Sequence, residues 1–298
     1  MLPRPRALAL LVALLSLRAA EAQACAVCSV GDPTLTVAGN ERPFEGRFRL
    51  SGTLRLGGLR SGAPGRDEIA LRERRLDLGV AYAPLPTLFL SVALPLLHRD
   101  TTDVQDRRQS TFTLGDVELR AKYFAWQGRR GPYAHHFAVQ GGLKLPTAPL
   151  VRGVDGQALS MNLQPGMGAV TPMVGAFYGF TRGIYSLFAS ATFYLPIAMR
   201  EGPHGADSLR SSISAQIQPQ RSFALRFGLD TRLDSSAELN GASDPNTGGF
   251  VGHVSPELVS SPVTDLVLHA GAHFPVVQAL RGYHREAPIL AVGALYDF

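Results

Sequence analysis

The stretch AVGALYDF, residues 291–298, closes the chain and decides the expected fold. Successive side chains of a β-strand point to opposite faces, so every second residue back from the end forms one apolar stripe: Phe298, Tyr296, Ala294, Val292 and Leu290. Terminal residues of soluble domains usually fray into water, whereas this strand ends on an aromatic side chain. The stripe therefore faces either the core of a soluble sheet or membrane lipid, with its aromatics at the membrane–water boundary.

The ending resembles the C-terminal signature of bacterial outer-membrane β-barrels. Phe298 is terminal, Tyr296 stands two residues before it, and apolar residues occupy every second position upstream. In that class the signature is what the barrel-assembly machinery recognises. The resemblance therefore implies outer-membrane lipid and that machinery as partners, with Tyr296 and Phe298 as the assembly signal.

The first residues read as a secretory signal peptide. Arg4 and Arg6 precede the apolar run 7–17, which is too short to span a bilayer as a helix, and small residues surround Ala24. We expect residues 1–24 to be removed on export from a Gram-negative cytoplasm, while acylation of Cys25 as a lipoprotein is a minor alternative. The leader carries three arginines and one glutamate, so its removal lowers the formal net charge from +5 to about +3.

The rest of the chain alternates with a period of two. In residues 44–56, Phe48, Leu50 and Leu54 share one face while arginines, Ser51 and Thr53 share the other. A soluble β-sandwich would turn the charged face to water, whereas an outer-membrane barrel turns it to the lumen. The secretory leader, the terminal Phe298 and segments longer than ten residues favour the barrel, because sandwich strands are usually nearer five or six residues.

We expect an all-β fold, an antiparallel transmembrane β-barrel of about 12 strands, with 10–14 as the range, over residues 44–298. Strands are predicted to begin near residues 44, 68, 87, 111, 133, 168, 183, 208, 221, 249, 263 and 286, with turn-forming residues between them. Long polar breaks at 98–110, 147–162 and 234–248 alternate with tight ones. An even strand number places both ends of the chain on the periplasmic side.

Three stretches resemble the outer-membrane transporters named after the MetA pathway of phenol degradation: LGDVELRAKY (114–123), GGLKLPT (141–147) and NLQPGMGAVTPMVGAFYGF (162–180). The match covers roughly residues 110–180, and elsewhere only the strand rhythm agrees. The chain departs from the family at Ala148-Pro149, where the family has glycine and an acidic residue. The resemblance implies a passive channel or transporter without a reaction.

The only two cysteines, Cys25 and Cys28, form a C-x-x-C in the predicted periplasmic segment 25–43. They could make a local disulfide, a redox pair or part of a metal site, and a partner-binding segment that engages a periplasmic redox or metal protein stays open. Ser29 stands where c-type haem attachment needs histidine. We expect no cofactor.

The inward charges are the candidate functional residues. They are Glu45, Arg47, Arg49, Arg55, Glu73, Arg75, Asp77, Asp116, Glu118, Arg120, Lys122, Arg226, Asp230 and Arg232. Charges that line a pore tune ion selectivity, but in a narrow barrel they can instead pair across the lumen as structural filling. We find no catalytic motif and no lysine- or arginine-rich run for nucleic acid, so we expect neither enzyme activity nor nucleic-acid binding.

These patterns predict an outer-membrane β-barrel that acts as a passive channel or transporter for small or apolar solutes. The alternative is a structural or partner-binding barrel.

Overall fold

The computed structural model describes residues 46–198, 203–220, 222–239 and 242–298. Glu45, Cys25, Cys28 and the predicted signal peptide lie outside the described residues, so the expectations for them stay predictions. The described part of the chain contains no helix that is both long and apolar enough to cross a membrane.

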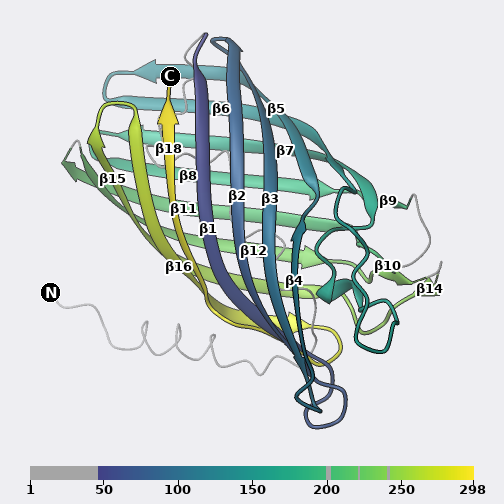
Figure 1. Cartoon of the computed structure of the whole chain (residues 1–298). Helices are drawn as coiled ribbons and strands as arrows, with labels where there is room; N and C mark the ends of the chain where they lie inside the picture. The colour runs from purple at the N-terminus through teal and green to yellow at the C-terminus, as the bar shows by residue number, and fades with distance from the viewer. Residues whose placement is uncertain (1–45, 199–202, 221, 240–241) are drawn as a thin grey trace, which may run out of the picture.

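Twelve antiparallel wall strands close into a barrel (Figure 1). Ten are continuous: β1 (Phe48–Ser61), β2 (Ile69–Leu85), β3 (Leu88–Asp103), β6 (Tyr133–Leu145), β7 (Ala169–Arg182), β8 (Tyr185–Tyr194), β11 (Ser208–Gln220), β12 (Phe223–Asp234), β15 (Gly249–Val263) and β16 (Leu266–Leu280). Two are broken into halves: β4 (Arg108–Leu114) with β5 (Val117–Arg130), and β17 (His284–Glu286) with β18 (Ile289–Asp297). The predicted fold class and strand number are confirmed.

The barrel closes because the first strand pairs with the last. In β1, Thr53 is the register partner of Asp77 on β2 and of Gly293 on β18. A closed sheet leaves no unpaired edge, which is the condition for strands to cross a bilayer.

The structure departs from the sequence prediction in the connections. Residues 98–103 and 108–110 are strand, so the predicted long break at 98–110 shrinks to the turn 104–107. The fourth strand stops at Gly115 and Asp116, where the Gly115 N–H donates to the carbonyl oxygen of Pro95. Polarity alone suggested a loop at 98–110, whereas cross-strand pairing with β2 and β4 continues through residues 98–103.

The alternation of side chains holds around the wall. On β18, Leu290, Val292, Tyr296 and Phe298 are 42–59% exposed on the outer face, while Ala291 and Leu295 are buried. On β1, Phe48, Leu50, Leu54 and Leu56 are exposed outward and the charged residues between them are half-buried. The barrel is therefore apolar outside and charged inside.

The two ends of the barrel differ. At the tight-turn end, residues 86–87, 131–132, 183–184 and 264–265 join strands, with Gly131, Gly183 and Asp265 at φ near +60°. Here Phe48 stacks on Tyr82 at 4.5 Å and Tyr296 contacts Phe298 at 4.8 Å, and the C-terminus ends there (Figure 1).

The long-loop end carries the described residues 62–68, 104–107, 146–168, 195–198, 203–207, 235–239, 242–248 and 281–283. It holds short elements that the sequence did not predict: η1 (Met161–Leu163), β9 (Ile197–Ala198), and the small sheet of β10 (Pro203–His204), β13 (Glu238–Leu239) and β14 (Ala242–Ser243).

Candidate functional site: a charged lumen beneath an inward-folded loop

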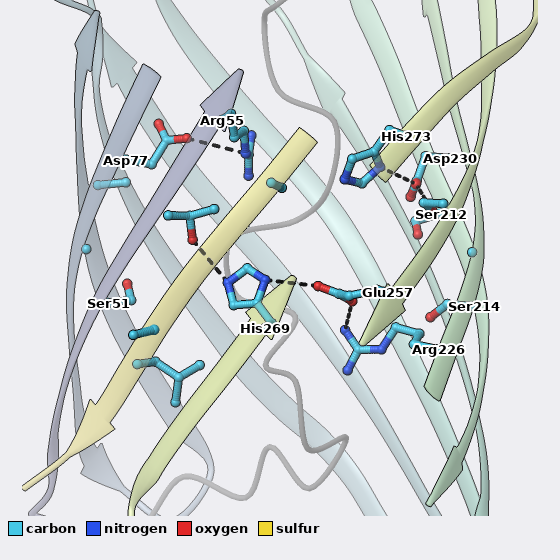
Figure 2. Close-up of a pocket in the computed structure, with 18 of the residues that line it drawn as sticks. Ser51, Arg55, Asp77, Ser212, Ser214, Arg226, Asp230, Glu257, His269 and His273 are labelled. Carbon is cyan, nitrogen blue, oxygen red and sulfur yellow. Dashed lines mark hydrogen bonds and ion pairs between the residues drawn. The ribbon is translucent and has the colours of Figure 1, made fainter. Parts of the chain in front are cut away.

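A polar chamber occupies the middle of the lumen (Figure 2). Its cavity volume is about 130 Å³, and it is partly open to solvent. Its polar lining comes from β1, β2, β11, β12, β15 and β16 and comprises Ser51, Thr53, Arg55, Asp77, Ser212, Ser214, Arg226, Asp230, Ser255, Glu257, His269 and His273. Arg55, Asp77, Arg226 and Asp230 were predicted from the alternation.

On one wall of the chamber, Asp77 lies between two arginines. Arg75 Nε donates to Asp77 Oδ1 at 2.7 Å, and Arg55 Nε lies 3.6 Å from Asp77 Oδ2. Arg55 and Arg75 are register partners on β1 and β2, so their like charges would repel without the carboxylate. The predicted charges here are paired, as the structural-filling alternative expected.

On the opposite wall, Glu257 joins an arginine and a histidine. Arg226 Nη1 donates to Glu257 Oε2 at 3.1 Å, and His269 Nδ1 lies 3.0 Å from Glu257 Oε1 (Figure 2). His269 also contacts the Thr53 hydroxyl at 3.3 Å, so this chain of contacts reaches β1. Sequence reasoning missed Glu257, because β15 lacks a clear polar alternation that would mark its inward face.

Asp230 is held by a hydroxyl and an imidazole. The Ser255 hydroxyl donates to Asp230 Oδ2 at 2.6 Å, and His273 Nδ1 lies 3.3 Å from the same oxygen. The serine hydroxyl meets the carboxylate and not the imidazole, so the three groups do not form a nucleophile relay.

The predicted charges near the tight-turn end also have partners. Arg49 makes a bidentate contact with Asp297 at 2.6 and 2.8 Å. Arg47 lies 2.9 Å from Asp265 and donates to the carbonyl oxygen of Phe298. These contacts join the first strand to the last residues of the chain.

The lumen face of β5, β6, β7 and β8 combines ion pairs with aromatic rings. Arg120 donates to Glu118, which also lies 3.9 Å from Lys144 Nζ. Lys122 is almost fully buried, with its amine 4.1 Å from the centroid of Phe177. Phe177 packs with Phe124, Ala138 and Phe188, so this side of the lumen is filled.

At the long-loop end, ion pairs of the buried residues Arg99 and Arg232 stabilise the mouth of the barrel. Arg99 donates to Glu73 and to the carbonyl oxygen of Leu163 at 2.8 Å. Arg232 donates to Asp234 at 2.7 Å and to Glu286 at 2.5 Å. Glu73 and Arg232 were predicted as inward charges, and Glu286, which the broken last strand turns inward, was missed.

The segment 146–168 folds into this mouth, and Asp116 anchors it. The Asp116 carboxylate accepts the backbone N–H groups of Ala148 at 3.2 Å and Met167 at 2.5 Å. The Thr147 hydroxyl donates to the carbonyl oxygen of Gly115 at 2.8 Å. These contacts bring together residues from all three stretches that carry the family resemblance, so the stretches meet at one node.

No space remains between the Asp116 carboxylate and the returning chain. A Cβ at Gly166 would lie 2.3 Å from Asp116 Oδ1, so glycine is required where the returning chain passes. The sequence predicted Asp116 as a lumen charge, and the structure uses it instead to hold a loop.

Asn162 and Leu163 of the segment 146–168 pack inside the long-loop end of the barrel. Leu163 packs on Leu59 and Leu71 inside the wall. The side-chain nitrogen of Asn162 lies 2.6 Å from His284 Nε2, which also contacts the carbonyl oxygen of Asn246 at 3.0 Å. Burial lowers the pKa of His284 below its usual value, so the imidazole is neutral in this contact.

The remaining histidines give no metal site. His135 faces outward with Nδ1 2.8 Å from the Tyr178 hydroxyl, while His136 stacks on Phe177 in the lumen, so the adjacent pair points to opposite faces. Within the described ranges, no three residues among histidine, cysteine, aspartate and glutamate come together as a metal centre.

A closed twelve-strand barrel with an apolar outside and a charged lumen defines the class of outer-membrane β-barrels. The comparisons agree with that class. The crystal structure of an outer-membrane channel from Pseudomonas putida F1 matches with a TM-score of 0.67 and 14% identity, over 90% of this chain and 100% of that chain.

Two other structures match less well. The transport unit of the autotransporter AIDA-I from Escherichia coli has a TM-score of 0.48 at 13% identity, over 90% of this chain and 93% of its own. The monoaromatic hydrocarbon channel CymD has a TM-score of 0.40 at 7% identity, over 85% and 89%. No family model and no curated protein matches the chain. The likeness to the Pseudomonas channel therefore shows the fold, and the MetA-pathway resemblance rests on its three stretches.

Proposed function

We propose that the chain is a passive outer-membrane channel for small polar solutes, with its path through the lumen chamber. The observation that carries the proposal is the chamber itself, which is lined by charged groups and hydroxyls on opposing walls. An apolar solute would displace water from these groups without replacing its hydrogen bonds, which is costly. A small polar solute can replace them.

The fixed charges around the chamber balance when its histidines are neutral. Asp77, Asp230 and Glu257 are matched by Arg55, Arg75 and Arg226. Charges that line a pore tune its ion selectivity, so we expect weak selectivity in the unchanged chain, and removal of one carboxylate should leave an excess of positive charge.

The inward-folded segment 146–168 limits the size of the solute. It meets both Arg99 and His284 across the long-loop mouth, and Leu163 packs on Leu59 of β1 and Leu71 of β2. In an outer-membrane barrel the long loops face the outside, so this segment would control entry from the extracellular medium.

The test is ion selectivity in a planar bilayer with a salt gradient of potassium chloride. The Glu257→Gln and Asp230→Asn variants should move the reversal potential toward anion preference, because each removes one carboxylate from the chamber. Asp106→Asn, in an exposed turn, is the control and should leave the potential unchanged. Unchanged potentials in both lumen variants would mean that ions do not pass through the chamber.

A further inference from the structure

Four arginines gather on the outer wall of the barrel at the long-loop end. Arg60 on β1 is the direct register partner of Arg285 on β17, and it lies diagonal to Arg72 on β2, which shares its face with Arg74. All four side chains are exposed. These residues, Arg60, Arg72, Arg74 and Arg285, form the outer-wall arginine patch.

The patch has little counter-charge from the protein. Arg60 lies 3.2 Å from Glu68, whereas Arg72, Arg74 and Arg285 make no ion pair or hydrogen bond with the part of the chain that the structure describes. Asp100, the register partner of Arg72, lies 3.8 Å from His98. Like charges directly opposite one another on adjacent strands destabilise a sheet, so the Arg60–Arg285 pair calls for an external anion.

The height of the patch matches the far edge of the membrane. Arg74 stands eight residues, and Arg60 twelve, from the stacked Tyr82 and Phe48 at the tight-turn end. At about 3.3 Å per residue and a strand tilt near 40°, this places the patch roughly 20 to 30 Å from that aromatic pair. An outer-membrane barrel has an apolar band about 25 Å tall, so the patch lies at the outer headgroup level.

The wall below the patch is apolar and exposed. Leu54, Leu56, Leu78 and Val80 are 39–47% exposed on the outer face of β1 and β2. A ligand that carries a phosphate above long acyl chains would meet arginines with its head and this apolar surface with its chains. Free phosphate would use only the first of these two surfaces.

We propose that the outer-wall arginine patch binds the phosphate groups of an anionic lipid in the outer leaflet. The guanidinium fork matches phosphate oxygens in pairs, and its charge persists at any physiological pH. A basic residue near an anionic membrane surface contributes about five-fold in affinity, so three arginines together contribute on the order of 100-fold. The inference goes beyond solute passage and depends only on the outer-membrane location.

The test measures binding of purified lipid A to the folded full chain in maltoside micelles by native mass spectrometry. The triple variant R60Q/R72Q/R74Q should bind the lipid on the order of 100-fold more weakly. R129Q/R130Q changes two exposed arginines at the tight-turn end and should stay within about two-fold of the unchanged chain. Dephosphorylated lipid A should bind as weakly to the unchanged chain as lipid A does to the triple variant.

Three results would overturn the proposal. They are full affinity in the triple variant, equal binding of the dephosphorylated lipid, and complete competition by millimolar inorganic phosphate, which would indicate a free-phosphate site. If the triple variant does not fold, the single variants Arg72→Gln and Arg74→Gln replace it, and each should lose about five-fold.

Discussion

At the scale of one residue, the position of Asp116 was predicted correctly but its role was not. The alternation predicts that it faces the lumen, and the structure buries it there with two backbone N–H groups from the segment 146–168 as donors. Sequence could not reveal this role, because the donors stand 32 and 51 residues further along the chain.

The Asp116→Ala variant should therefore release the segment without opening the barrel wall. Hydrogen bonds to a charged group contribute roughly 1.5–3 kcal/mol each, so the closed loop should lose several kcal/mol. Trypsin cleavage after Arg152, an exposed residue in the segment, should become much faster. Asp106→Asn, in an exposed turn, serves as control, because asparagine tolerates the positive φ at this position. Equal cleavage rates for Asp116→Ala and the unchanged chain would contradict the anchor.

We expect opening of the long-loop mouth to depend on pH through His284. Its folded pKa lies below the ordinary value of 6.5 because burial disfavours the charged ring. Its contribution to the closed loop is therefore complete above about pH 6.5 and declines as the pH falls below that value. Single-channel recordings should show more frequent openings at pH 5.5 than at pH 7.5.

The His284→Gln variant keeps a polar side chain at that position and cannot titrate. Its opening frequency should be the same at both pH values. A pH response that persists unchanged in this variant would assign the effect to another group.

At the scale of elements, the period of two predicted most of the wall. Predicted strand starts agree with the observed ones within about four residues, since each strand turns alternate side chains to lipid and lumen. The breaks at Gly115–Asp116 and Ala287–Pro288 were not predicted. The first depends on the distant segment 146–168, which folds against the wall, and the second falls at Pro288, which lacks a backbone N–H. The ion-pair partners were not predictable either, since cross-strand register decides them.

The alternation can be tested on adjacent residues of β1. Leu54→Arg puts a charge on the lipid face and should cost about 2–4 kcal/mol near the bilayer midplane. Thr53→Arg points into the chamber and should cost much less. Gly293 is unsuitable as the inward site, since a Cβ there would lie 2.2 Å from His269 Nε2. Urea unfolding in lipid vesicles measures both free energies, and equal losses would contradict the alternation.

The last strand offers a second test at this scale. The Phe298 N–H donates to the carbonyl oxygen of Phe48, and its ring packs edge-on against Tyr296 at the tight-turn end. We propose that this aromatic end guides assembly, so a chain ending at Asp297 should show a lower folded fraction in outer membranes at equal expression. An unchanged folded fraction would make Phe298 an ordinary strand end.

At the scale of the whole molecule, the structure combines a closed barrel, a charged chamber and an inward-folded loop. In the proposed function, the wall crosses the membrane, the chamber accepts polar solutes and the loop limits access. Ion pairs fill much of the lumen, so we expect passage to depend on the chamber that they leave between them.

Single-channel conductance in a planar bilayer tests this account most directly. The intact chain should give small, discrete current steps, and a variant with residues 149–165 replaced by a short Gly-Ser linker should give steps several times larger. Trypsin resistance of the wall strands would show that the variant is folded. Folded protein that gives no current steps with either chain would contradict the channel.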